Sequence, residues 1–132
     1  MIDISMYIGI PFVDGGRLLS GADCYGVVML YYKNILSIDI PDVQITANEP
    51  RKSFIKYLDE VNKHWTKLDK PQQHCGVALR MNTEHPRLVT HFGIMLDDHR
   101  LLHSIKPIGS HVVDIDNPTV KSRIEGFYKW QP

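Results

Sequence analysis

The order of hydrophobic patterns along this chain is the feature that most restricts its fold. Apolar residues recur at helical spacing in two segments of the first half, 23–36 and 49–68, whereas the second half contains short apolar runs. A period of about 3.6 residues predicts amphipathic helices, and short runs between turn residues predict strands. Helices followed by strands favour an α+β domain over a wound parallel sheet, in which helices and strands alternate.

Turn-forming and capping residues set the limits of the expected elements. Residues 7–22 contain scattered Pro, Gly and Ser and are predicted to form a loop. Asp23 is predicted to cap the first helix, and Pro50 suits the first turn of the second helix. The apolar stripe of that second helix is expected to contain Phe54, Leu58, Val61 and Trp65. Strands are expected at 77–81, 89–96, 100–105, 111–115 and 126–130, with a helical turn at 117–122.

Composition indicates a single globular domain over residues 1–132. Fifteen Lys and Arg balance fifteen Asp and Glu, so the formal charge is zero, and 43% of the residues are hydrophobic. Neutrality argues against nucleic acid or an anionic membrane as a partner, and no apolar run approaches the roughly 20 residues of a membrane span. The N-terminus lacks the pattern of a signal peptide, so we expect synthesis in the cytoplasm, where Cys24 and Cys75 would stay free thiols.

Cys24 stands one residue after the predicted helix cap, behind a glycine-rich loop. A helix N-terminus carries partial positive charge and unpaired N–H groups, which favour the thiolate and lower the pKa of a thiol. The same N–H groups can stabilise an oxyanion during acyl transfer. This placement suits a nucleophile. The alternative is that Cys24 is a small buried hydrophobic residue, as free cysteine often is.

Two histidines provide the base that such a nucleophile needs. His91 begins one apolar run and His103 lies in the next, and the turn-rich segment 97–99 separates these runs. The pattern predicts a hairpin that brings the two histidines together. One imidazole could then accept the proton of Cys24 while the second orients the first. Taken alone, either histidine could equally be a locally hydrogen-bonded or solvated residue at a strand end.

The combined pattern resembles the NlpC-type cysteine peptidases, papain-like enzymes that cut the peptide stems of bacterial cell wall. The match covers most of the chain and consists of an aromatic residue, a Gly-Gly pair, Asp-Cys at a helix start, and two histidines twelve residues apart. It looks closest to the small single-domain branch encoded with the tail genes of long-tailed bacteriophages, which tends to have an aromatic residue after the cysteine. The matching residues are Phe12, Gly15, Gly16, Asp23, Cys24, Tyr25, His91, Gly93, Ile94 and His103.

The resemblance implies a papain-like fold in which an N-terminal catalytic helix packs on a central antiparallel sheet, with a second helix on the flank. It implies that Cys24 is the nucleophile, His91 the general base and His103 the residue that orients it, with no cofactor. The implied substrate is a peptidoglycan stem peptide, cut after the γ-linked D-glutamate and typically before diaminopimelate.

Three substrate-binding positions are also implied, and two of them depart from the family pattern. Phe12 stands where the family usually has a tyrosine whose hydroxyl helps position the substrate carbonyl or oxyanion. Tyr25 replaces a serine that, in wall-recycling members, helps bind a free N-terminal amine. Asp23 remains for that role.

The sequence leaves more than one class of function open. The leading hypothesis is a peptidoglycan endopeptidase in a phage tail, located in the virion and aiding wall penetration or tail assembly with tail-tip proteins as partners. The second hypothesis is a structural tail-tip component with weak or no catalysis, and the third is a cellular amidase acting on another amide. A metal site is not expected, because Cys75 and the adjacent His74 lack further ligands at zinc spacing.

Overall fold

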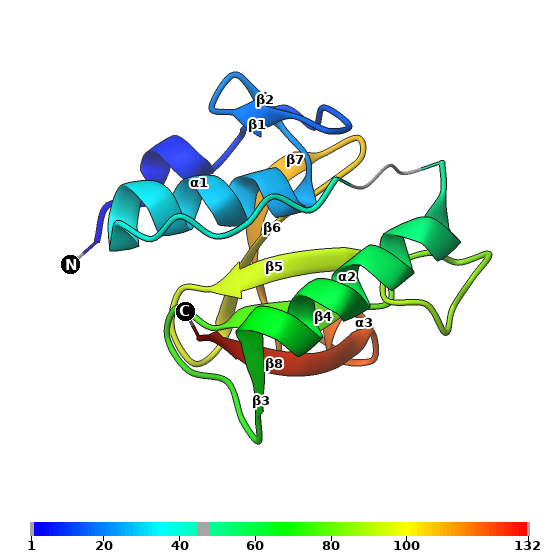
Figure 1. The fold of residues 1–132 in the computed structure, drawn as a ribbon. Coiled ribbons are helices and arrows are strands. Elements are labelled where there is room, and N and C mark those ends of the chain that lie inside the picture. The colour runs from blue at the N-terminus through cyan, green and yellow to red at the C-terminus, as the bar shows by residue number, and fades with distance from the viewer. Residues whose placement is uncertain (1, 45–47, 132) are drawn as a thin grey trace.

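Six strands from the second part of the chain form one antiparallel sheet (Figure 1). The computed structural model describes residues 2–44 and 48–131. Within these ranges the strands lie side by side in the order β3-β8-β4-β5-β6-β7. Their bounds are β3 Trp65–Leu68, β4 Gly76–Leu79, β5 His91–Met95, β6 Arg100–Ile105, β7 Gly109–Asp114 and β8 Ile124–Trp130. The predicted α+β class with a central antiparallel sheet is confirmed.

Helix α1, Cys24–Leu36, begins where the sequence predicted. The Asp23 carboxylate accepts a hydrogen bond from the backbone N–H of Gly26 at 2.8 Å, which satisfies one of the free donors of the first turn. The helix ends at Ser37, whose left-handed backbone (φ 56°) lets its N–H reach the carbonyl of Tyr32. Val27, Val28 and Tyr31 are buried, so one side of α1 packs on the sheet.

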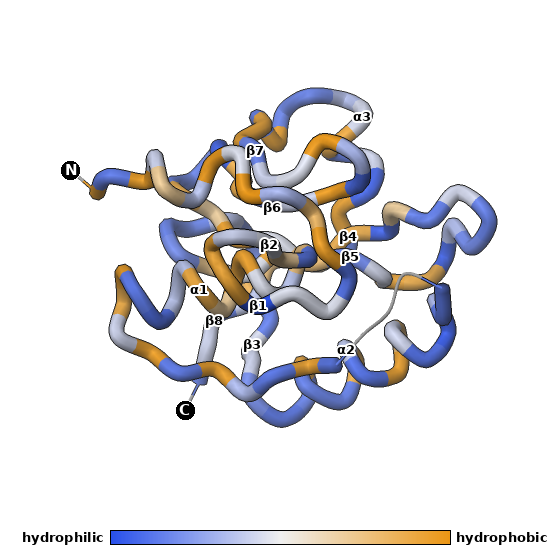
Figure 2. The backbone as a smooth tube through the Cα atoms, turned by 90° about the horizontal axis from the view of Figure 1, so that it is seen from above, coloured by the Kyte–Doolittle hydropathy of each residue, from blue (hydrophilic) through white to orange (hydrophobic). Residues whose placement is uncertain are grey.

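Helix α2, Pro50–His64, is shorter than predicted, and its buried face coincides with the predicted stripe only in part: Phe54 and Val61 pack half-buried against the core. The predicted stripe was wrong at Leu58, which is 47% exposed, whereas Tyr57 and Glu60 are buried. Figure 2 shows hydrophilic and hydrophobic segments alternating along α2, so apolar side chains alone do not mark its buried face. Glu60 is tolerated there because it pairs with His64, with Oε1 and Nδ1 2.9 Å apart.

The end of α2 is the second correction, since the sequence predicted helix to residue 68. Trp65 instead has extended backbone and begins β3, which pairs with β8 in the register Trp65↔Trp130. The Trp65 indole meets the rings of Trp130 at 5.4 Å and Phe92 at 5.2 Å between centroids. Edge-on aromatic packing of this kind adds roughly 0.5–1.5 kcal/mol per pair beyond burial. These contacts are non-local, so helical periodicity in the sequence could not reveal them.

The sheet has a core on each face. On one face, α1 and α2 cover a large cluster to which Ala78, Phe92 and Leu102 contribute from the sheet. The other face carries a smaller cluster that includes Cys75 and Leu101, partly covered by helix α3, Pro118–Lys121. The predicted helical turn at 117–122 is confirmed as α3, which the Asn117 side chain caps. Both cysteines are free thiols.

The segment before α1 is more ordered than the predicted loop. It contains the 3-10 helix η1 Ser5–Tyr7 and a two-stranded hairpin of β1 Arg17–Leu18 and β2 Gly21–Ala22. Phe12 bridges to Ala22, which holds this segment beside the start of α1. A Cβ on Gly26 would lie 2.2 Å from the Gly16 carbonyl oxygen, so glycine is required where the hairpin crosses the helix. In the described ranges, no helix is long and apolar enough to cross a membrane.

Candidate active site

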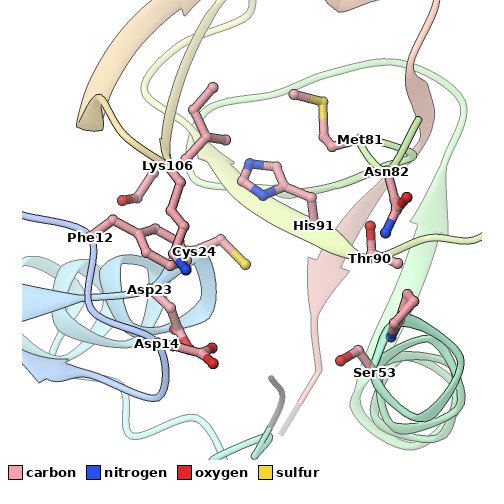
Figure 3. Close-up of a pocket in the computed structure, with 13 residues that line it drawn as sticks. Phe12, Asp14, Asp23, Cys24, Ser53, Met81, Asn82, Thr90, His91 and Lys106 are labelled. Carbon is pink, nitrogen blue, oxygen red and sulfur yellow. The ribbon is translucent and has the colours of Figure 1, made fainter. Parts of the chain in front are cut away.

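The N-terminus of α1, the start of β5 and the end of β6 meet around a cavity of about 190 Å³ (Figure 3). Cys24 and His91 both line it, and in the close-up their side chains point into the same space. The cavity is bounded by loop residues before α1 on one side and by the first turns of α2 on the other. Its lining residues are Phe12, Asp14, Asp23, Cys24, Pro50, Ser53, Met81, Asn82, Thr90, His91, Ser104, Ile105 and Lys106.

Cys24 lies in the first turn of α1 on its buried side, as predicted, and is 4% exposed. Its Sγ is 3.0 Å from the hydroxyl oxygen of Tyr57 on α2. Burial, followed by the Asp23 carboxylate, raises the pKa of the Cys24 thiol to about 11. The sequence argument predicted a lowered pKa from the helix terminus. That expectation was wrong, because burial and the Asp23 carboxylate outweigh the hydrogen bonds that Tyr57, Phe92 and Tyr25 provide.

His91 and His103 are neighbours across β5 and β6, as the hairpin pattern predicted. Nε2 of His91 is 2.8 Å from Nδ1 of His103, and their rings meet nearly perpendicular. Burial, together with the charge of its partner, lowers the pKa of His91 well below its ordinary value, so His91 is neutral near pH 7. Because Nε2 of His91 is hydrogen-bonded to His103, Nδ1 of His91 is the ring nitrogen that is left to accept a proton.

Gly93 makes this pair possible, since it follows His91 by two residues on β5 and lies against His103 of β6. A Cβ at position 93 would lie 3.1 Å from Cβ of His103 and 3.0 Å from the carbonyl oxygen of Leu102. A side chain there would push β6 away from β5. The Gly in the His-x-Gly pattern thus has a steric role.

His111 adds a third imidazole to the cluster. It pairs with His103 in the β6–β7 register, and the two ring centroids are 4.5 Å apart. Burial, followed by the charge of His111, lowers the pKa of His103 to about 4. His111 itself is half-buried. Among the described residues, Nε2 of His103 is buried and has no hydrogen-bond partner.

Asp23 lies at the cavity but its carboxylate is engaged by the protein itself. Oδ1 accepts from Gly26 and from Arg17, the latter at 2.6 Å, and Oδ2 accepts from the backbone N–H of Gly15 at 3.0 Å. Burial raises the pKa of Asp23, although Arg17 and the N–H donors act in the opposite direction. The residue therefore holds the loop to the helix. Contact with a substrate amine would add a further partner to this network.

The two aromatic residues expected to meet substrate occupy different environments. Phe12 lines the cavity, and the Lys106 ammonium lies 5.7 Å from the centre of its ring. Tyr25 is 1% exposed and does not line the cavity. Its ring packs against Phe92 and Tyr57 in the core, with centroid distances of 5.8 and 5.9 Å. The structure thus places Phe12 at the site and Tyr25 beneath it.

Sequence reasoning missed Tyr57, which contacts the candidate nucleophile. The residue was not part of the predicted apolar stripe of α2, because the apolar pattern selected the face of Leu58. A weak signal exists in the positions Ser53, Tyr57, Glu60 and His64, which recur at helical spacing and form the observed inner face. Their polar side chains obscure that signal.

Metal-ligating side chains gather elsewhere in the described ranges. Asp97, Asp98 and His99 lie close together in the exposed turn between β5 and β6, outside the cavity. His99 is already bound to the neighbouring Asp98 carboxylate, with 2.8 Å between Nδ1 and Oδ1. Exposed acidic turns of this type are common without an ion.

Comparison with known proteins gives a match in structure and none in sequence. No model of a known protein family matches the chain, and no curated protein matches it. The NlpC/p60 domain of the peptidoglycan hydrolase SagA is 19% identical, with a TM-score of 0.62 over 95% of this chain and 91% of that one. The fold is that of the NlpC/P60 domains.

Two bacterial proteins of the NlpC/P60 class show the same likeness over most of this chain. A lipoprotein-like NLP/P60 protein from Staphylococcus aureus is 21% identical, with a TM-score of 0.67 over 96% of this chain. An NlpC/P60 family protein from Bacillus cereus is 20% identical, with a TM-score of 0.68 over 97%. This chain spans 38% of the length of each of these two proteins. The predicted papain-like architecture, with α1 on a central antiparallel sheet and a second helix beside it, is therefore confirmed.

Proposed function

We propose that this protein is a cysteine endopeptidase that hydrolyses peptidoglycan stem peptides. The observation that carries the proposal is the shared cavity of Cys24 and His91, with His91 held through Nε2 by His103. A nucleophile, a base and a residue that orients the base are the parts that acyl transfer requires. The NlpC/P60 fold supports the substrate class, because a peptidoglycan hydrolase domain shares it.

In the proposed reaction, Nδ1 of neutral His91 accepts the thiol proton as Sγ of Cys24 attacks the scissile carbonyl carbon. The N–H groups of Gly26 and Val27 are committed to Asp23, and the backbone of Tyr25 is hydrogen-bonded to the Cys24 sulfur, so the oxyanion is left to the N–H group of Cys24 at the helix end. His91 then returns its proton to the leaving amine as the C–N bond breaks. Water attacks the thioester with His91 again as base, which releases the acid product and the thiol.

The raised pKa of Cys24 decides how this reaction starts. With a thiol pKa of about 11 and a His91 pKa well below the ordinary value, the resting pair is a neutral thiol and a neutral imidazole. The proton is therefore transferred during attack, as in serine hydrolases, and no preformed thiolate–imidazolium pair is needed.

The scissile bond we propose follows the γ-linked D-glutamate, typically before diaminopimelate. Stem peptides carry free carboxylates near this bond, and Lys106 brings a cationic side chain to the cavity wall. A lysine ammonium suits such a group as a point charge. Phe12 beneath the ammonium provides an apolar surface beside it.

The test is hydrolysis of purified muropeptides, followed by mass spectrometry. We expect wild-type protein to release fragments cut after γ-D-glutamate, Cys24→Ala to release none, and the matched thiol variant Cys75→Ala to keep activity. Cys75 is a suitable control because it is also a buried free thiol, but in the cluster on the other face of the sheet. Equal cleavage by wild type and Cys24→Ala would refute the assignment.

The setting we propose is the tail of a bacteriophage, with the protein in the virion and tail-tip proteins as partners. The sequence pattern supports this setting. Tyr25 is an aromatic residue directly after the cysteine, and segment 38–42, which follows the first helix, is similar to the corresponding segment of the phage-tail branch. A phage carrying Cys24→Ala tests the role of catalysis there. Loss of infection with normal particle assembly is expected for an enzyme that aids wall penetration.

A structural role in the tail tip is the second candidate, and the deep burial of Cys24 favours it. A thiol that is 4% exposed with a pKa of about 11 is a weak nucleophile until substrate or a partner changes its surroundings. Under this alternative, the Cys24→Ala phage assembles and infects every host as well as wild type does.

A further inference from the structure

Tyr57 on α2 reaches the sulfur of Cys24 on α1 across the core. Its hydroxyl oxygen is 3.0 Å from Sγ, within the range of a hydrogen bond to sulfur. The two residues are 33 positions apart in the sequence, so this contact exists only because α2 packs beside the start of α1. Tyr57 does not line the cavity, so it approaches the sulfur from the core side and leaves the cavity side open for substrate.

The ring of Tyr57 is held in place by its neighbours. It is 2% exposed, stacks on Phe92 with an interplanar angle of 20°, and tilts against Tyr25. Phe92 follows His91 on β5, so one strand supports both the ring behind the sulfur and the candidate base in front of it. A fixed donor of this kind acts without the entropic cost of being ordered during the reaction.

Three hydrogen bonds lower the pKa of the Cys24 thiol, and the Tyr57 hydroxyl has the largest effect, followed by the backbone groups of Phe92 and Tyr25. Burial and the Asp23 carboxylate both raise the pKa of the thiol. Of the charged and aromatic groups that line the cavity with it, Asp14 from the loop brings a carboxylate, Phe12 has no donor and His91 is neutral, while the Lys106 ammonium lies over the Phe12 ring. Tyr57 itself has a pKa raised well above its ordinary value by burial, so it remains a protonated donor whenever Cys24 ionises.

We propose that Tyr57 is a thiolate-stabilising residue of this active site: its O–H donates to Sγ of Cys24 and aims the sulfur into the cavity. The inference deepens the proposed function, because it assumes that Cys24 is the nucleophile. It assigns to α2, which carries none of the residues of the peptidase pattern, a direct part in the chemistry. The inner face of α2 is then a functional face as well as a packing face.

The experiment compares Tyr57→Phe with Tyr25→Phe, which is a closely matched control. Both tyrosines are buried in the same ring cluster, but the Tyr25 hydroxyl has no hydrogen-bond partner among the described residues. Alkylation by iodoacetamide is measured from pH 6 to 10, and the modification of each cysteine is followed at the peptide level by mass spectrometry. Cys75 is the internal reference in every sample, and thermal melting confirms that each variant is folded.

We expect Tyr57→Phe to slow alkylation of Cys24 by about tenfold or more at each pH, since a hydrogen bond to a charged group is worth at least one power of ten in ionisation. Cys75 in that variant, and both thiols in Tyr25→Phe, should react at wild-type rates. An unchanged or faster rate at Cys24 in Tyr57→Phe would overturn the proposal. The assay uses no peptidoglycan, so its result stands whether or not muropeptides are cleaved.

Discussion

Gly93→Ala is the sharpest steric test of the candidate site, because one methyl group would enter the contact between β5 and β6. The added Cβ would lie 2.7 Å from Cδ1 of Leu101, 3.0 Å from the carbonyl oxygen of Leu102 and 3.1 Å from Cβ of His103. Leu101 and Leu102 are fully buried and His103 is 3% exposed, so none of these atoms can move into solvent. The clash must be relieved by separating the two strands.

The magnitude follows from two opposing effects. Overpacking of a closely packed interior costs about 1–3 kcal/mol, and replacing glycine by alanine returns about 0.4–1 kcal/mol through the unfolded state. The central values of these ranges leave a net loss of about 1.3 kcal/mol, which lowers Tm by roughly 4–7 °C in a domain of this size. The same movement lengthens the 2.8 Å contact between His91 and His103, so kcat on muropeptides should fall by at least about tenfold.

Gly126→Ala is the matched control, since Gly126 is also a buried glycine in a central strand, β8. A Cβ there would meet Cε of Lys67 at 2.8 Å, and the exposed end of that flexible side chain can swing into solvent. We expect Gly126→Ala to change stability by less than about 1 kcal/mol and to keep full activity. The two variants are compared by thermal melting and by muropeptide hydrolysis. Equal melting temperatures for both variants and wild type would refute the steric reasoning.

Three further predictions concern charge and protonation. Alkylation of wild-type Cys24 should be slow at pH 7 and rise about tenfold per pH unit toward its pKa of about 11, and a plateau near pH 8 would contradict the effect of burial. Since the pKa of His103 falls to about 4 in the folded protein, the unfolded chain binds the proton more tightly, and stability should fall as pH drops from 6.5 to 4. For His103→Asn, the free energy of unfolding measured in urea should fall less over that pH range. A fall identical to that of wild type would contradict the role given to His103. Lys106→Gln should raise KM for muropeptides several-fold with little change in kcat, because Lys106 lines the cavity. The control Lys67→Gln, in strand β3 away from the cavity, should leave both constants unchanged.

The local elements of the site could be predicted from the sequence because their causes are local. Asp23 caps α1 with its own side chain three residues from its partner, so Cys24 necessarily lies in the first turn. His91 and His103 belong to strands joined by a short turn, and an antiparallel hairpin brings such residues together. The inner face of α2 and the start of β3 could not be predicted in this way. Tyr57 and Trp65 are placed by partners far along the chain, such as Cys24 and Trp130.

The sequence by itself determined the class of the fold and singled out Cys24 with a pair of histidines, while their separate roles came from the resemblance to the NlpC-type peptidases. The fold class and the choice of these residues depend on capping, periodicity and hairpin spacing, which act over a few residues. Only the tertiary structure decided the protonation of the site. Burial of Cys24 raises the pKa that the helix end alone would lower, and burial of His91 keeps it neutral. The cost of removing charge from water depends on everything packed around a group, and here that includes a hydroxyl from a helix outside the peptidase motif.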